Sequence, residues 1–159
     1  MTIRNATGAL MFAIALSSMP QLASASDSGL ITKPSKYSVL DTIERFEVAI
    51  KARGWVVFAE LDHAAAAAKV GLPLRPRTVV VFGNPELGTV PMQKAPTLAI
   101  DNPPKALVWQ DDQGQVWLTY NTADYIARHV YPRHAATGSA EGFTKLQEFL
   151  DEMSDQATK

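Results

Sequence analysis

Near the middle of the chain lies the run Thr78-Val79-Val80-Val81-Phe82, in which every residue is β-branched or aromatic. Such residues favour strands, and a short continuous apolar run bounded by turn signals is typical of a buried strand. We therefore predict a buried central strand over residues 78–82. Gly83 and Asn84-Pro85 follow at once, and both are turn signals.

Further strands are expected on either side of this run. Residues 55–61 form one, and residues 106–110 and 115–120 form a hairpin around the four-residue turn Asp111-Asp112-Gln113-Gly114. Leu30-Ile31 begins a strand that Lys33-Pro34 confines to an edge, because proline has no N–H to donate. The pattern predicts a mainly antiparallel sheet of about five strands.

The clearest helix starts at Ser38, which can cap it, with Asp41 three residues later in a capping-box arrangement. Gly54 is the expected C-terminal stop. The intervening apolar residues fall on one helical face. They are Val39, Ile43, Phe46 and Ile50.

Three more helices are predicted from caps and periodicity. Asp62 caps a short alanine-rich helix over residues 63–70. A second helix covers residues 122–130 and is stopped by Pro132, and a third covers residues 141–153. Strands and helices together predict an α+β fold, in which a single compact domain has its sheet packed by helices.

The composition excludes several classes of function. The 159 residues include no cysteine, which rules out thiol catalysis, thiolate metal sites and iron–sulfur clusters. The formal net charge of -1 gives no basic footprint for nucleic acid and no polybasic patch for a membrane surface. We therefore expect no nucleic-acid partner.

The N-terminus has the three-part pattern of a secretory signal. Arg4 precedes the apolar run Ala9–Met19, and Ala23-Ser24-Ala25 supplies a small-x-small cleavage site. The alternative is a membrane anchor, but Ser17-Ser18 and Pro20-Gln21 interrupt a run that would need about 20 apolar residues. We expect a periplasmic or secreted protein with no stable membrane insertion after cleavage.

This pattern predicts four parts of the chain. Residues 1–25 are the cleaved signal peptide, and residues 26–37 are an N-terminal segment with the edge strand. Residues 38–135 are the α+β core, and residues 136–159 are a C-terminal helix and tail.

The most irregular segment is Gly83 to Pro104, a long proline-rich loop. Pro96 could start a helical turn over residues 97–100, but little other regular structure is expected. Long loops in compact domains tend to be functional or mobile. Its prolines are Pro85, Pro91, Pro96, Pro103 and Pro104.

No standard catalytic motif is present, but two clusters could carry chemistry. Glu60, Asp62 and His63 converge at a strand-to-helix junction and could bind a metal ion, because hard cations take carboxylates and imidazole suits zinc, copper or iron. The simpler interpretation is that Asp62 only caps the helix over residues 63–70, His63 lies in the first turn of that helix, and Glu60 is solvated.

The second cluster is Phe82-Gly83-Asn84-Pro85, at the end of the buried strand. Gly83 would allow close backbone approach, and Asn84 offers both a donor and an acceptor. A plain Asn-Pro turn explains the same residues equally well.

Three other polar residues have simpler roles. Asn121, after Tyr120, is interpreted as a helix cap. His129 and His134 are interpreted as cations near a helix C-terminus rather than as metal ligands.

These motifs resemble the bacterial and archaeal domain-of-unknown-function family number 302. The resemblance covers most of the chain after the signal, in the family's order. Its matching pieces are the helix over residues 38–54, Phe58-Ala59-Glu60-Leu61-Asp62-His63-Ala64-Ala65-Ala66, Gly71-Leu72-Pro73-Leu74-Arg75-Pro76, Val81-Phe82-Gly83-Asn84-Pro85, residues 88–92, residues 96–103 and Val116-Trp117-Leu118-Thr119-Tyr120-Asn121.

The resemblance implies a compact α+β fold, dimers and no established activity, and it places the helix after Gly138 beyond the usual core. A cysteine-bearing branch of the family has thiols near Gly83 and Pro104. This chain has no cysteine, so any thiol function is not carried over. The residues that the resemblance implies as a pocket are Asp62, His63, Phe82, Gly83, Asn84, Pro85 and Met92.

The leading hypothesis is a non-catalytic periplasmic module that binds a small ligand or a metal ion and acts as a homodimer. The alternative is a metal-dependent enzyme or redox accessory that uses Glu60, Asp62 and His63. A third hypothesis is a purely structural dimer, with the proline-rich loop around Pro91 and Met92 as its interface. The sequence names no cofactor beyond a metal ion at the first cluster.

Overall fold

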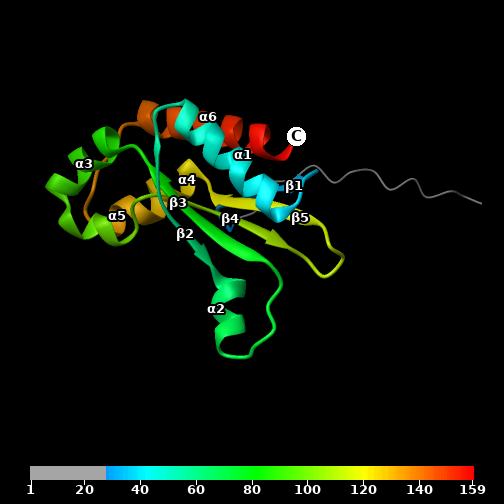
Figure 1. Ribbon diagram of the computed structural model, residues 1–159. Helices are drawn as coiled ribbons and strands as arrows, with labels where there is room; N and C mark the ends of the chain where they lie inside the picture. Colours follow the sequence, from blue (N-terminus) through cyan, green and yellow to red (C-terminus); the bar gives the residue numbers. More distant parts are fainter. Residues whose placement is uncertain (1–27) are drawn as a thin grey trace, which may run out of the picture.

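The computed structural model describes residues 28–159 (Figure 1). The expected signal peptide, residues 1–25, lies outside the described residues and stays a prediction. The elements in chain order are β1 (Leu30–Ser35), α1 (Val39–Ala52), β2 (Val56–Asp62), α2 (His63–Lys69), β3 (Arg77–Gly83), α3 (Pro85–Lys94), the 3-10 helix η1 (Pro96–Ile100), β4 (Lys105–Gln110), β5 (Val116–Asn121), α4 (Ala123–Tyr125), the π-helix η2 (Ile126–Val130), α5 (Tyr131–Arg133) and α6 (Ala140–Thr158).

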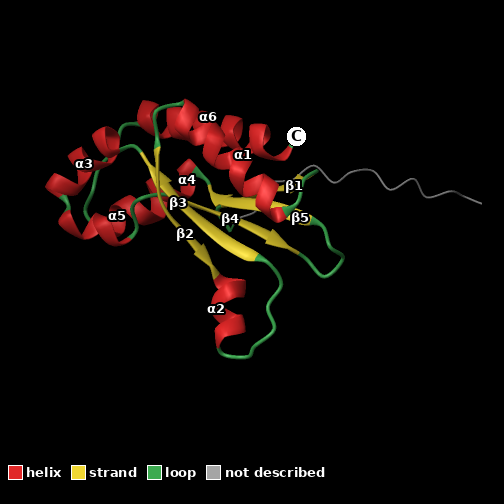
Figure 2. Ribbon diagram, in the orientation of Figure 1, coloured by secondary structure: helices red, strands yellow, loops and turns green. Residues whose placement is uncertain are grey.

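All five strands form one antiparallel sheet in the order β1-β5-β4-β3-β2. The helices α1 and α6 lie side by side across one face of this sheet (Figure 2). The predicted fold class is confirmed: a single α+β domain with a mainly antiparallel five-stranded sheet packed by helices.

The hydrophobic core lies between the sheet and these two helices. Alternate residues of the strands point into it, such as Val80 and Phe82 of β3, as expected for the two-residue period of a strand. The four-residue stripe predicted for the first helix faces them, with Phe46 packed edge-on against Phe82 at 5.3 Å between ring centroids. From α6, Met153 is fully buried, so the C-terminal helix is part of the same core.

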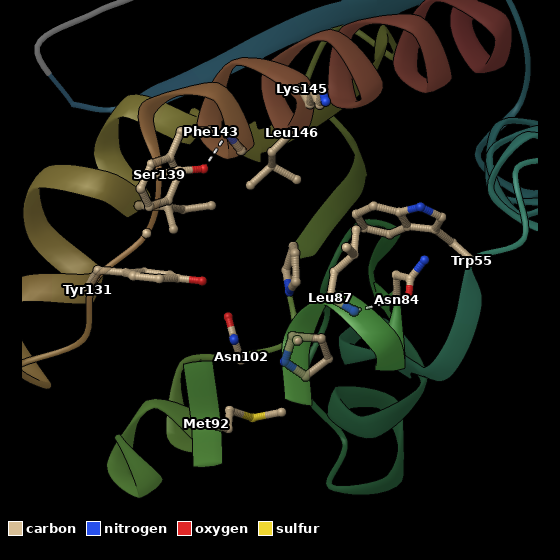
Figure 3. Close-up of a pocket in the computed structure, with 16 residues that line it drawn as sticks. Trp55, Asn84, Leu87, Met92, Asn102, Tyr131, Ser139, Phe143, Lys145 and Leu146 are labelled. Atoms are coloured by element: carbon tan, nitrogen blue, oxygen red, sulfur yellow. Dashed lines mark hydrogen bonds between the residues drawn. The ribbon is translucent and has the colours of Figure 1, made fainter. Parts of the chain in front are cut away.

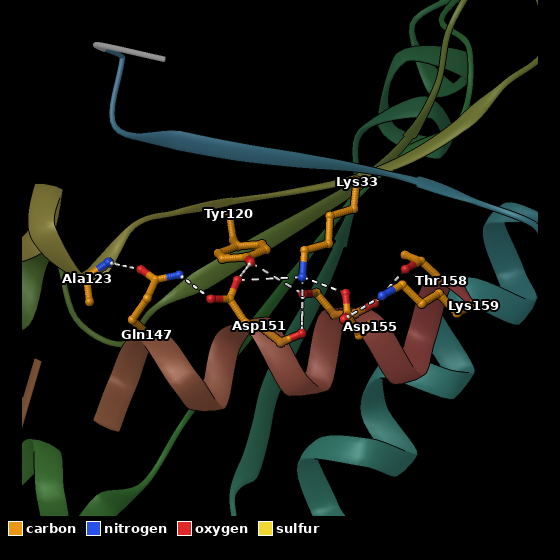
Figure 4. A network of polar contacts seen from close by, with 9 residues as sticks. Lys33, Tyr120, Ala123, Gln147, Asp151, Asp155, Thr158 and Lys159 are labelled. Atoms are coloured by element: carbon orange, nitrogen blue, oxygen red, sulfur yellow. Dashed lines mark hydrogen bonds and ion pairs between the residues drawn. The ribbon is translucent and has the colours of Figure 1, made fainter. Parts of the chain in front are cut away.

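A polar network holds α6 against β1 and β5 (Figure 4). The hydroxyl of Tyr120 donates to Asp151, and the ammonium of Lys33 lies 2.7 Å from a carboxylate oxygen of Asp155. Burial and the neighbouring Asp151 raise the pKa of Tyr120 well above its ordinary value, so the phenol stays protonated. Because both strands contribute, this network fixes where α6 crosses the sheet.

The segment expected to be a long proline-rich loop is largely helical, which corrects the prediction. Asn84 caps α3 by accepting hydrogen bonds from the backbone N–H groups of Glu86 and Leu87, and Pro85 occupies the first turn, where its missing N–H costs nothing. The expectation failed because Pro91 lies inside the helix, where proline is normally excluded. The predicted turn after Pro96 is present as η1.

The predicted stop at Pro132 is also wrong. The chain passes from α4 through η2 into α5 without leaving helical geometry, and Pro132 sits in the first turn of α5. Just before this proline, the N–H of Tyr131 donates to the carbonyl of Ile126, five residues earlier. The π-helix makes this possible by changing the hydrogen-bond register ahead of the proline.

The apolar run from Thr78 to Phe82, in β3, is buried on one face only. Thr78, Val80 and Phe82 are buried, whereas Val79 and Val81 are partly exposed on the opposite face.

No helix of the described residues, 28–159, is long and apolar enough to cross a membrane.

Candidate functional site

A cavity of about 330 Å³ opens where α3, α5 and the start of α6 meet (Figure 3). Its walls are mainly apolar, and they come from segments far apart in the sequence. The lining residues are Trp55, Asn84, Leu87, Gly88, Met92, Asn102, Pro103, Pro104, Ile126, Tyr131, Gly138, Ser139, Gly142, Phe143, Lys145 and Leu146.

Few polar groups reach the cavity. The hydroxyl of Tyr131 points into it opposite the side-chain amide of Asn102 (Figure 3). Burial raises the pKa of Tyr131, and a hydrogen bond with Asn102 opposes that rise in part. The hydroxyl therefore stays neutral at physiological pH and can both donate and accept a hydrogen bond.

The only cation of the lining is Lys145, at the rim. Its ammonium already lies 2.6 Å from a carboxylate oxygen of Glu141, and its side chain is largely exposed. The interior of the cavity therefore offers hydrogen bonds but no charge.

Two glycines let the walls approach closely. A Cβ on Gly138 would lie 2.7 Å from the ring of Phe143, which itself packs edge-on against Tyr131. A Cβ on Gly83 would lie 3.0 Å from Pro103, so β3 and the residue after the Asn102–Pro103 cis bond are in direct contact. Gly83 thus allows a close contact within the chain, and its predicted place beside a ligand stays a prediction.

A histidine outside the cavity fixes one of its walls. His134 has a nearly buried side chain and lies 2.6 Å from Asp101 through Nε2 and 3.0 Å from Thr97 through Nδ1. The hydrogen bond with His134 holds the pKa of Asp101 below its ordinary value. Because Asn102 follows Asp101 directly, this contact ties the wall of the cavity to the end of α5.

The structure divides the predicted pocket among three places. Asn84 and Met92 line the cavity, and Pro85 starts the helix that carries Met92. Phe82 is fully buried in the core instead. Asp62 and His63 belong to the other end of β2, where α2 projects away from α1 and α6 (Figure 1).

The predicted convergence of Glu60, Asp62 and His63 does not form. Asp62 accepts a hydrogen bond from the N–H of Ala65, as the capping interpretation expected, and a carboxyl–carboxyl hydrogen bond with Glu47 raises the pKa of Glu60. Within residues 28–159, no group of three or more His, Cys, Asp or Glu side chains is arranged to hold a metal ion. Glu60 is turned toward α1 because strand alternation places it on the helix-covered face.

The main cavity residues that the sequence did not suggest are Trp55, Tyr131, Phe143 and Leu146. Each reads as an ordinary core residue of its own element. The only local sign was a pair of glycines, Gly138 and Gly142, around the start of α6.

Comparison with known proteins agrees with this architecture. The model of a family described as "Domain of unknown function DUF302" matches residues 31–153. The chain belongs to the DUF302 family. The match extends through most of α6, in keeping with the buried position of that helix in the core.

One solved structure of a DUF302 protein superposes well. It is the crystal structure of an uncharacterized conserved protein from Bacillus stearothermophilus, with a TM-score of 0.67 and 18% identity. The alignment covers 81% of this chain and 98% of that one, so the two share the fold.

The curated relatives are larger proteins. "Fluoride-specific ion channel FluC 1" of Brucella suis is 46% identical over 109 residues, which cover 69% of this chain and 43% of the relative. "Fluoride-specific ion channel FluC 2" of Brucella melitensis is also 46% identical over 109 residues, which cover 40% of its length. The chain thus matches about two fifths of the length of these relatives.

Proposed function

We propose that this DUF302 domain is a non-catalytic binding module of the periplasm, and that the cavity beside α3 and α6 holds a small amphipathic ligand. The observation that carries the proposal is a cavity of about 330 Å³ with apolar walls and a few converging polar groups. Such cavities are the usual form of small-molecule sites, and this volume is at their lower limit.

The lining indicates the class of ligand. Leu87, Met92 and Leu146 would enclose an apolar body. The buried end of the ligand would meet Tyr131 and Asn102, which are both neutral. Because burying an ion without a counter-charge is costly, that end is expected to be an uncharged alcohol, carbonyl or amide.

The test is a binding titration with matched pairs of probes, such as aromatic and medium-chain alcohols and the corresponding carboxylates. Trp55 lines the cavity, so its fluorescence reports occupancy, and the melting temperature provides a second reading. The alcohols should bind and the carboxylates should not. Carboxylates that bind equally well would contradict the proposed chemistry, and a lack of binding by the whole series would contradict the site.

Two variants of the same helix sharpen this test. In Gly88→Phe the new side chain would fill the cavity, since a Cβ at Gly88 meets nothing nearer than the methyl group of Met92 at 3.8 Å. Val90→Phe adds a comparable ring at a position that is 54% exposed and does not line the cavity. Binding should be lost in the first variant and kept in the second.

The periplasmic location rests on the N-terminal sequence pattern. Fractionation of the native host followed by mass spectrometry should find a chain that begins at Ser26. A chain with an intact N-terminus in the cytoplasmic fraction would contradict the proposed periplasmic location.

A second proposal follows from the curated relatives: the domain works beside a fluoride channel in the cell envelope. Its support is the 46% identity to a part of proteins named fluoride-specific ion channels. Loss of this chain should then change the fluoride tolerance of the host, and the chain should copurify with such a channel. Unchanged tolerance in a deletion strain that still exports fluoride would argue against it.

A further inference from the structure

Three polar side chains beside η1 form a row of hydrogen bonds outside the cavity. Nδ1 of His134 lies 3.0 Å from the hydroxyl of Thr97, and its Nε2 lies 2.6 Å from a carboxylate oxygen of Asp101. Thr97 belongs to η1 and Asp101 follows that helix, whereas His134 follows α5, 33 positions after Asp101. None of the three lines the cavity of the proposed ligand.

The carboxylate decides which nitrogen of the imidazole carries the proton. The hydrogen bond with His134 holds the pKa of Asp101 below its ordinary value, so at neutral pH the carboxylate is ionised and only accepts hydrogen bonds. Nε2 of His134 is therefore the N–H donor, and Nδ1 of the neutral ring keeps a lone pair. That lone pair accepts the hydroxyl proton of Thr97, so the imidazole has the tautomer of a general base for this hydroxyl.

The order of hydroxyl, imidazole and carboxylate is that of a nucleophile with an adjacent base. In the Ser-His-Asp arrangement the carboxylate holds the imidazole in the correct tautomer and stabilises the imidazolium that forms. Asp101 is a positioning residue of this kind. The side chain of His134 is only 5% exposed, so the surrounding packing also restricts the ring.

The hydroxyl, in contrast to the base, is accessible from solvent. Thr97 is exposed on η1. Side chains three positions apart lie above one another in a 3-10 helix, so Ile100 flanks Thr97. Ile100 is 76% exposed, and its apolar surface beside the hydroxyl suits an acyl chain.

The charges next to Asp101 favour an anionic intermediate. The guanidinium of Arg133 lies 3.3 Å from the carboxylate, and the positive charge of Lys105 also acts on that carboxylate. Together the two cations and the one carboxylate carry a net positive charge. Such a charge stabilises the negative oxygen that develops when a carbonyl group is attacked.

We propose that Thr97 is a site of covalent O-acylation, with His134 as the general base and an activated acyl donor, a thioester or an aryl ester, as the substrate. Oγ1 of Thr97 attacks the carbonyl carbon while its proton passes to Nδ1 of His134. The bond to the leaving sulfur or oxygen then breaks, and Nδ1 returns the proton to the leaving group.

The products are an ester at Thr97 and a free thiol or phenol, and nothing is oxidised or reduced. Each chain accepts a single acyl group. The modification therefore adds to a binding module without making it an enzyme that turns over.

The experiment treats the purified chain with p-nitrophenyl acetate at neutral pH and follows each acetylated peptide by mass spectrometry. The internal control is Thr89, which is exposed on α3 and has no side-chain hydrogen bond among residues 28–159. A positioned base accelerates proton transfer by about 10²–10⁴-fold, so Thr97 should be acetylated at least about 100-fold faster than Thr89. Equal rates at the two threonines would overturn the proposal.

Nitrogen NMR of the histidine rings tests the base without any variant. At a pH where its ring is neutral, His134 should be the Nε2–H tautomer, because Nε2 faces the carboxylate of Asp101. An Nδ1–H tautomer would leave no lone pair for the hydroxyl of Thr97 and would overturn the assignment of His134 as the base.

Two variants separate activation of Thr97 from a purely structural contact. His134→Asn removes the base and should slow acetylation of Thr97 at least about 100-fold. Asp101→Asn removes the ionised acceptor and should slow it at least about 10-fold, with loss of the Nε2–H tautomer. Acetylation of Lys69, exposed on α2, should stay unchanged in both variants and serves as the reference for reagent and fold. A folded His134→Asn variant that acetylates Thr97 at the native rate would show that the contact is only structural.

Discussion

The contact between Asp101 and His134 gives a prediction that the structure defines in both size and pH dependence. Asp101→Asn removes the carboxylate that lies 2.6 Å from Nε2 of His134. A hydrogen bond to a charged group contributes about 1.5–3 kcal/mol, and partial exposure of Asp101 places the expected loss near the lower end. For a domain of this size, that loss lowers the melting temperature by about 4–8 °C.

The sign of the pH dependence follows from the lowered pKa of Asp101. The folded state favours the ionised carboxylate, so its contribution is complete at pH values above the ordinary 3.8. The contribution is lost as the pH falls below 3.8 and through the lowered folded-state pKa. The difference between the native chain and Asp101→Asn should therefore be large at neutral pH and small in acid.

Urea unfolding at neutral pH and below pH 3.8 measures this difference directly. The matched control is Asp112→Asn, since Asp112 pairs with Arg75 at 2.8 Å but its side chain is 85% exposed. An exposed pair contributes at most about 1 kcal/mol, so the control should change little. A loss at Asp101 that is equal at both pH values, or no greater than that of the control, would refute the role given to His134.

Three further predictions concern the core, the cavity wall and a buried phenol. Leu118→Ala should destabilise the fold by about 2–5 kcal/mol in urea unfolding, whereas Leu40→Ala at an exposed site should have little effect, and equal losses would contradict the assigned core. Gly83→Ala should lower the melting temperature, because its Cβ would meet Pro103 at 3.0 Å, and an unchanged melting temperature would show that the wall yields. In an alkaline absorbance titration Tyr120 should be the last tyrosine to ionise, so Tyr120→Phe should remove only the final part of the signal, and loss of an earlier part would contradict its raised pKa.

Features that depend on near neighbours were predicted well. The caps at Ser38 and Asp62 and the apolar stripe of α1 were all identified from spacing, because helix and strand periodicities involve residues at most four positions apart. The hairpin between β4 and β5 was found for the same reason. The helix α3 was missed because Pro91 carries a strong local signal against it, and the helix that Asn84 caps nevertheless continues through that proline.

The candidate site was predicted only in part. Asn84 and Met92 were named because one follows a strand and the other belongs to a family motif, and both line the cavity. The proposed cluster around His63 failed because Asp62 turns to cap α2 and Glu60 interacts with Glu47, although the two share a face of β2. Tyr131 had no local signal, because its role depends on contact with Asn102, 29 positions earlier.

The sequence by itself determined the fold class, the five strands, the main helices and the absence of thiol chemistry. These follow from composition and short-range periodicity, which each segment carries alone. Only the tertiary structure decided where the cavity lies, that His134 contacts Asp101, and which face of β3 is partly exposed. Those features depend on long-range contacts between segments, and such contacts leave no regular spacing in the sequence.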